Sequence, residues 1–228
     1  MTAVLRELLS LTAAAVMMFS ETLSTTAPQN DLAGNLFLVN REWRVSKDYV
    51  PVVVEADVRG QVRNMQPDAA AALEKMFAAC HREMPDVTLV SVSGYRSYGK
   101  QSSIYQRKLN NVSGSRARAD KYVARPGASE HQLGLAMDVG QMKSKTGLNA
   151  SFGSTKGGKW LREHCWEYGF ILRYDEGWED VTGYSYEPWH VRYVGPEFAK
   201  RIHLENVPLE IFLDEYRQET LLQVLKGK

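Results

Sequence analysis

Hydrophobic residues recur along the chain at two spacings, which predict short strands alternating with helices. Residues 87–94 alternate between apolar and small polar side chains and include β-branched residues, a pattern typical of a strand. Residues 67–84 begin with Pro67 and Asp68 and continue with an alanine-rich body, which favours a helix. By the same criteria, further strands are expected at 36–40, 135–139, 170–174 and 189–194, and further helices at 99–110, 157–168, 196–204 and 208–224. Helices around short strands indicate an α+β fold.

The N-terminal part of the chain differs from this pattern. Residues 8–19 form an apolar run after Arg6, and at about 1.5 Å per residue they span roughly 18 Å, less than the ~30 Å core of a bilayer. This length is typical of the core of a secretory signal peptide, and residues 20–35 have the composition of a linker. Glu7 and the lack of a clear cleavage site leave an uncleaved membrane anchor or a cytoplasmic helix as alternatives.

We therefore predict export to the cell envelope, with possible membrane association through the apolar run. Residues 1–34 are expected to hold the signal-like segment and linker, and residues 35–228 to form one domain. A second irregular region is expected at residues 111–128, which are polar and contain glycine and proline.

The charge and cysteine content narrow the function further. The chain has 28 Lys and Arg against 27 Asp and Glu, a net charge of +1 that gives no electrostatic case for nucleic acid. A basic cluster at 116–125 is either a solvated loop or a means of attracting an anionic substrate, with Arg125 as the candidate substrate-binding residue. Cys80 and Cys165 exclude a disulfide framework and a thiolate zinc site. We interpret them as buried free thiols. If the protein is exported, a disulfide bond between them is the alternative.

The clearest candidate chemistry lies in two short segments, SEHQLGLAMD at 129–138 and EPWH at 187–190. They contain His131, Asp138 and His190, and two imidazoles with one carboxylate can bind Zn²⁺ while leaving a fourth position for water. A strand after Gly134 would bring Asp138 beside His131, and a distant strand would supply His190. Lone histidines are more often surface or core residues, but Gly134 allows close backbone approach and Pro188 stiffens the second segment. The pattern predicts a metal-dependent hydrolase.

Glu187 and Arg96 are the candidate catalytic residues around this site. Glu187 lies three residues before His190 and is predicted to accept the proton of the attacking water, the alternative being a surface glutamate. Arg96, at the end of a predicted strand, is placed to stabilise an oxyanion or hold a carboxylate, the alternative being a simple salt bridge. Weaker candidates are Gln101 and Ser129 as substrate hydrogen-bond partners, Asp180 as an acceptor behind a ligand imidazole, and His81, His164 and His203 as structural residues.

These motifs, taken together, resemble the D-alanyl-D-alanine carboxypeptidases of the VanY type, a family that includes L,D-carboxypeptidases. The resemblance covers residues 35–215 and rests on SGYRSY at 93–98 with Gln101, ARPG at 124–127, the two segments above, GKWL at 158–161, YGFILRY at 168–174 and RYVG at 192–195. It implies a small domain around an antiparallel sheet, with zinc in a surface cleft. It further implies that His131, Asp138 and His190 bind zinc, that Glu187 is the base, and that Arg96 assists substrate and transition state.

The implied reaction is removal of C-terminal D-alanine from peptidoglycan stem peptides, with D,D specificity favoured over L,D. Ala128 and Leu133 depart from the family pattern, which commonly has polar residues there, and both lie close enough to His131 in sequence to reshape the substrate pocket. Three alternatives remain: a peptidoglycan D,D-dipeptidase or endopeptidase, a non-catalytic peptidoglycan-binding module, and a serine hydrolase using Ser129 and His131. The absence of a Gly-x-Ser-x-Gly elbow disfavours the last.

Overall fold

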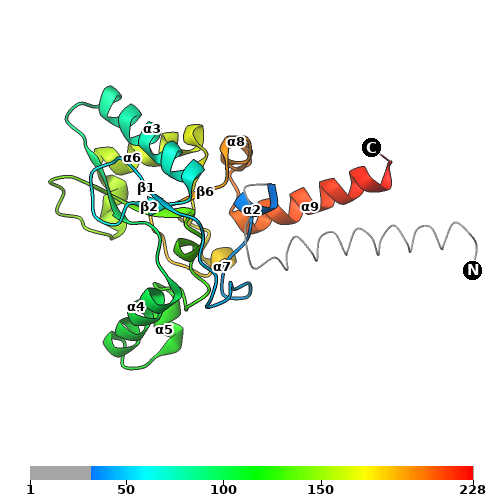
Figure 1. Ribbon diagram of the computed structural model, residues 1–228, viewed down its shortest axis with the longest axis horizontal. Coiled ribbons are helices and arrows are strands. Elements are labelled where there is room, and N and C mark those ends of the chain that lie inside the picture. Colours follow the sequence, from blue (N-terminus) through cyan, green and yellow to red (C-terminus); the bar gives the residue numbers. More distant parts are fainter. Residues whose placement is uncertain (1–31, 228) are drawn as a thin grey trace, which may run out of the picture.

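A four-stranded antiparallel sheet forms the centre of the protein (Figure 1). The structure is a computed structural model that describes residues 32–227. The strand order is β3 (Leu89–Ser93), β4 (Ala136–Gln141), β6 (His190–Tyr193) and β5 (Phe170–Leu172). The two middle strands, β4 and β6, are therefore supported on both edges, and side chains on them are held rigidly.

Helices cover the sheet and close the domain at its C-terminal side. They are α3 (Pro67–Glu83), α6 (Lys156–His164), α8 (Pro196–Glu205) and α9 (Leu209–Leu225). The larger apolar cluster lies between the sheet, α3 and α6, and a smaller one joins α8 and α9 to β5. Helix α9 extends away from the rest of the domain, whereas α4 (Tyr98–Asn111) and α5 (Arg116–Asp120) form a separate lobe on another side (Figure 1).

Shorter elements complete the fold. They are α2 (Leu32–Asn35), α7 (Glu179–Thr182), the two-stranded sheet of β1 (Val54–Glu55) and β2 (Asn64–Met65), and the 3₁₀ turns η1 (Glu130–Leu133), η2 (Ala150–Ser154) and η3 (Cys165–Tyr168). Mixed helices and antiparallel strands confirm the predicted α+β class. The buried residues of α3 include Leu73, Met76 and Cys80, spaced three to four apart as the sequence pattern predicts.

The strand predicted at 36–40 is wrong, because these residues have no ladder partner. Their continuous apolar run has another cause: Leu36 and Leu38 enter the smaller apolar cluster, whereas Phe37 and Val39 enter the larger one. The carbonyl oxygens of Asn35 and Phe37 accept hydrogen bonds from Arg192 Nη2, each at 2.9 Å. Burial on two sides thus produces the pattern of a strand without a sheet.

Other boundaries also shift. The predicted loop at 111–128 contains α5, which Ser115 caps by accepting from the backbone N–H of Arg118. The helix predicted at 157–168 divides into α6 and η3 before Gly169, whose φ of +81° ends it. Cys80 and Cys165 are buried free thiols. Of the predicted linker at 20–35, residues 32–35 form α2 and the rest lies outside the described residues.

The apolar run at 8–19 also lies outside the described residues, so the predicted signal segment stays a prediction. Within residues 32–227, no helix has both the length and the apolar character needed to cross a bilayer.

Candidate active site

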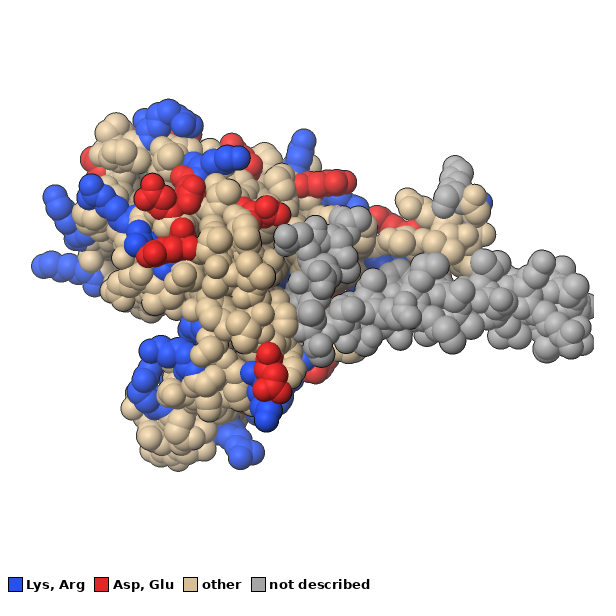
Figure 2. All heavy atoms as spheres, in the orientation of Figure 1, with Lys and Arg blue, Asp and Glu red and all other residues tan. Residues whose placement is uncertain are grey.

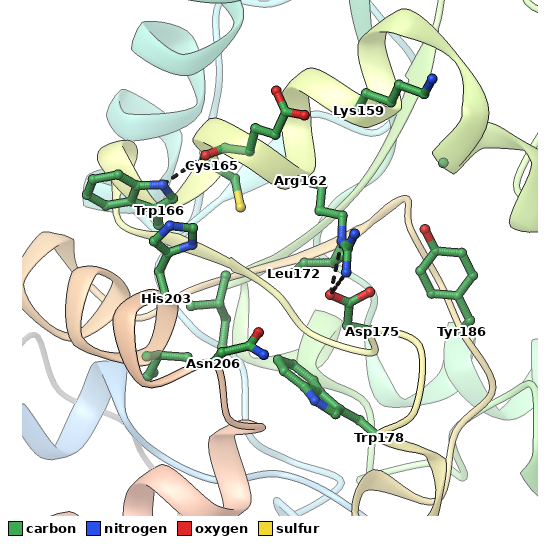
Figure 3. A pocket seen from close by; sticks show the side chains of 14 residues that line it. Lys159, Arg162, Cys165, Trp166, Leu172, Asp175, Trp178, Tyr186, His203 and Asn206 are labelled. Carbon is green, nitrogen blue, oxygen red and sulfur yellow. Dashed lines mark hydrogen bonds and ion pairs between the residues drawn. The ribbon is translucent and has the colours of Figure 1, made fainter.

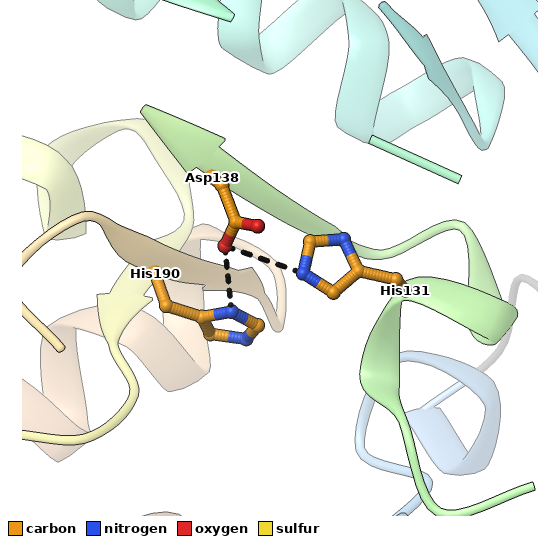
Figure 4. A group of neighbouring side chains, drawn as sticks. All are labelled: His131, Asp138 and His190. Carbon is orange, nitrogen blue, oxygen red and sulfur yellow. Dashed lines mark hydrogen bonds and ion pairs between the residues drawn. The ribbon is translucent and has the colours of Figure 1, made fainter. Parts of the chain in front are cut away.

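Three predicted metal ligands meet at the centre of the sheet (Figure 4). Asp138 on β4 is the register partner of His190, the first residue of β6. His131 lies on η1, and Gly134, with a φ of +72°, turns the chain from η1 into β4. Asp138 Oδ1 is 3.3 Å from His131 Nε2 and 3.1 Å from His190 Nδ1. The three side chains are buried, and their donor atoms lie within 4.8 Å of one another.

The donor set fits a metal ion. His131 Nδ1 donates to the carbonyl oxygen of Gly94 at 2.8 Å, so its Nε2 carries the lone pair. This Nε2 is buried and has no hydrogen-bond partner within the described part of the chain. Burial lowers the pKa of His131 to about 4, which keeps the imidazole neutral and able to ligate. A neutral imidazole and a carboxylate that face the same point without a proton between them are suited to Zn²⁺.

His190 faces a carboxylate on each side. Burial lowers its pKa, but hydrogen bonds with Asp138 and Glu130 outweigh burial and raise the pKa to about 9. The two carboxylates therefore stabilise a positive charge on or beside the His190 imidazole. A proton on His190 provides such a charge, and a metal cation between His190 and Asp138 would provide it equally.

Glu130 is the acceptor behind this imidazole. Its Oε2 lies 3.2 Å from His190 Nε2, and its Oε1 accepts from Arg173 Nε at 2.8 Å and from Arg192 Nη1 at 2.9 Å. Burial raises the pKa of Glu130, but the two guanidinium groups outweigh it and hold the pKa well below its usual range. Arg173 also forms two hydrogen bonds, at 2.9 and 2.6 Å, with Glu210 of α9.

The prediction that Asp180 accepts a hydrogen bond from a ligand imidazole is wrong. Asp180 is exposed on α7, while Gly94 and Glu130 occupy the positions behind the two histidines. Glu130 was missed although it directly precedes His131. The sequence indicates Glu130 only through its position next to His131. Its two neutralising partners, Arg173 and Arg192, lie 43 and 62 residues away along the chain.

Both candidate catalytic residues line a pocket of 60 Å³ together with His131 and His190. Glu187 joins His190 across a turn in which the His190 backbone N–H donates to the Glu187 carbonyl oxygen at 3.0 Å. Burial raises the pKa of the Glu187 carboxyl to about 7. Arg96 Nη2 donates to Asp138 Oδ2 at 3.2 Å, so this guanidinium stands beside the metal ligands.

The three predicted substrate-binding residues are placed differently. Gln101 and Ser129 line the pocket; Gln101 accepts from Arg96 at 3.2 Å and donates to the Ala124 carbonyl oxygen at 2.7 Å. Arg125 is not among the lining residues, and its guanidinium pairs with Asp120 through hydrogen bonds of 3.0 and 2.5 Å. Their roles toward substrate stay predictions. Ala128 and Leu133 are buried, and neither lines the pocket.

A second, larger cavity has a volume of 630 Å³ (Figure 3). It is lined by α6, β5 and the following loop, and by His203 and Asn206 at the end of α8. Two of its charged groups form an ion pair, with Arg162 Nη2 2.9 Å from Asp175 Oδ2. The ring of Trp166 stacks on that of His203, with 4.7 Å between the ring centroids. Within residues 32–227 the only cluster of metal-ligating side chains is the one in the small pocket.

Comparisons with known proteins agree with this geometry. A family model described as VanY, D-alanyl-D-alanine carboxypeptidase, matches residues 62–196, which include the three candidate ligands, Glu187 and Arg96. The Bacillus subtilis (strain 168) protein YodJ is 40% identical over 198 residues, or 84% of this chain and 70% of that protein.

Two solved structures are also similar. The LdcB LD-carboxypeptidase is 41% identical with a TM-score of 0.74, over 81% of this chain and 88% of that one. A mutant of the vancomycin resistance D,D-pentapeptidase VanY in complex with Zn(II) is 32% identical with a TM-score of 0.67, over 78% of this chain and 98% of that one.

Proposed function

Because the chain belongs to the VanY family of D-alanyl-D-alanine carboxypeptidases, we propose that it is a zinc-dependent enzyme that removes C-terminal D-alanine from peptidoglycan stem peptides. The observation that carries this proposal is the cluster of His131, Asp138 and His190 at a pocket that His131 and His190 line together with Glu187. Since peptidoglycan lies outside the cytoplasmic membrane, we also propose that the protein acts there.

The residues around the ligands have matching chemical roles. Zinc, when bound to this donor set, supplies a Lewis acid and lowers the pKa of a coordinated water. Glu187, whose pKa is raised to about 7, accepts the proton of the attacking water and passes it to the leaving amine. Arg96 stabilises the negative charge that develops on the carbonyl oxygen, and its place beside Asp138 supports this role.

We propose a single terminal residue as the leaving group, in agreement with the family description of a carboxypeptidase. A D,D-dipeptidase or an endopeptidase would release a larger group.

The residue before the scissile bond can have either a D or an L centre, which gives two candidate specificities. The family description favours a D,D-carboxypeptidase, which shortens a pentapeptide. A specific observation favours an L,D-carboxypeptidase, which shortens a tetrapeptide: identity is 41% to the LdcB LD-carboxypeptidase and 32% to the D,D-pentapeptidase.

Release of D-alanine from synthetic stem tetrapeptide and pentapeptide tests the proposal. We expect zinc-dependent release from one of them, and loss of release and of bound zinc in His131→Ala. Release from the pentapeptide alone identifies the D,D enzyme, and from the tetrapeptide alone the L,D enzyme. Stoichiometric zinc without release from either peptide would contradict the proposal and favour an endopeptidase or a binding module.

A further inference from the structure

The lobe formed by α4 and α5, here the α4–α5 lobe (residues 98–125), has an unusual charge. It contains seven Lys and Arg and a single acidic residue, Asp120. The whole chain has 28 Lys and Arg against 27 Asp and Glu, so the remainder of the chain is net negative. Asp120 is buried and paired with Arg125, and it offers no negative charge at the surface. The lobe thus has a net positive charge, whereas the remainder of the chain has a net negative one.

The basic side chains of the lobe face solvent. The exposed ones are Lys100, Arg107, Arg116, Arg118 and Lys121. Within residues 32–227 none of these five forms an ion pair, and the single carboxylate of the lobe, that of Asp120, is buried against Arg125. Blue side chains mark this lobe at the bottom of Figure 2, and red and blue mix over the main body. Tyr122 adds an aromatic ring that is 54% exposed, with Lys108 Nζ 4.2 Å from its centre.

The lobe is also one wall of the candidate active site. Gln101 from α4 and residues 122–124, which follow α5, line the 60 Å³ pocket. Gln101 joins the two parts of this wall because it contacts both Arg96 and the Ala124 carbonyl oxygen. A polymer lying on the lobe would therefore pass beside the entrance through which a peptide end reaches Glu187.

We propose that the α4–α5 lobe is a docking surface for peptidoglycan, recognising the free carboxylates of stem peptides next to the one being cleaved. This inference rests on the proposed function: a carboxypeptidase substrate ends in a carboxylate, so a polymer with many uncleaved ends is a polyanion. Unpaired cations attract such a polymer over about 10 Å at moderate ionic strength. Several weak contacts on one strand add to the effective affinity without changing the chemistry in the pocket.

A charge-reversal triple variant tests the proposal, with a matched control. Lys100→Glu/Arg107→Glu/Arg118→Glu changes three exposed side chains of the lobe. Lys75→Glu/Lys145→Glu/Lys200→Glu makes the same net change of charge on α3, a loop and α8. D-alanine release is measured from one soluble stem peptide and from purified peptidoglycan freed of phosphate-containing polymers, at low and high salt.

At low salt, we expect the lobe variant to lose roughly tenfold in rate on the polymer and less than about twofold on the single peptide. High salt should remove the difference, and the control variant should resemble the wild type. Equal losses on both substrates, or an equal loss in the control variant, would overturn the proposal.

Sedimentation of the zinc-loaded protein with the same peptidoglycan separates this proposal from the proposed function. Loss of co-sedimentation in the lobe variant alone supports docking even if no stem peptide is hydrolysed. Co-sedimentation of the wild type that survives amidation of the peptidoglycan carboxylates would overturn the carboxylate assignment. Binding that appears only when phosphate-containing polymers are left in place, or binding to anionic vesicles in preference to peptidoglycan, would also overturn it.

Discussion

The two cavities of this protein share a wall and differ in almost every other respect. Tyr174 and Glu187 line the small pocket, and their neighbours Asp175 and Tyr186 line the large one. The two segments are joined by a hydrogen bond of 2.9 Å from the Glu187 backbone N–H to the Tyr174 carbonyl oxygen. The large cavity has ten times the volume, yet its Arg162 and Asp175 neutralise each other. Within residues 32–227 the buried His131 Nε2 of the small pocket has no hydrogen-bond partner, and this property marks a reactive site better than size does.

The largest expected effect on activity comes from Glu187, the candidate base on the small-pocket side of the shared wall. Glu187→Gln should lower kcat for D-alanine release by about a thousandfold, because the amide cannot accept a proton. Bound zinc, measured by atomic absorption, should remain stoichiometric. Tyr186→Phe, one residue away on the large-cavity side, should keep kcat within about twofold. Full activity in Glu187→Gln would refute the assigned base.

A second contrast is between two carboxylates that pair with arginines, Glu130 at the small pocket and Asp175 at the large cavity. Glu130→Ala should lower the free energy of unfolding by about 3–5 kcal/mol, because it leaves Arg173 and Arg192 buried with too little negative charge. Asp175→Ala should cost about 1 kcal/mol or less, because its partner Arg162 is 57% exposed. Urea unfolding of the zinc-free proteins measures both values. Similar costs for the two variants would show that the buried network is no more important than the exposed pair.

A third contrast is between Arg96, which lines the small pocket, and Arg162, which lines the large cavity. Arg96→Lys should lower kcat/KM by roughly 10- to 100-fold with zinc retained, since a lysine cannot reproduce the planar, multiple donors that contact both Asp138 and Gln101. Arg162→Lys in the large cavity should leave kcat/KM unchanged. Steady-state kinetics on the active stem peptide measures both, and equal losses would place function in the larger cavity as well.

The smallest expected effect concerns Cys165, which lines the large cavity but is almost completely buried. Burial raises the pKa of its thiol to about 12. The unfolded chain, with a thiol pKa of about 8.5, releases its proton first, so stability should fall as pH rises above about 8.5. Urea unfolding of Cys165→Ala between about pH 8 and 10 should show a shallower decline than the wild type. An unchanged slope would show that this thiol does not titrate differently on folding.

Much of the site could be predicted because its ligands belong to local patterns. His131 and Asp138 stand on either side of a glycine turn, and His190 begins a strand that alternation identifies. Predictions failed where the structure depends on contacts between residues that are far apart in the sequence. Residues 36–40 have the pattern of a strand but meet Arg192 instead of a neighbouring strand. Asp180 has the right side-chain type for an acceptor, but the tertiary contacts place Glu130 beside His190 instead.

The pair formed by Arg173 and Glu210 ties the last helix of the chain to the metal centre. Arg173 also donates to Glu130, and Glu130 faces the imidazole of His190, so a continuous set of side-chain contacts runs from α9 to a candidate ligand. Helix α9 therefore takes part in the charge balance of the metal centre although it supplies none of the three candidate ligands.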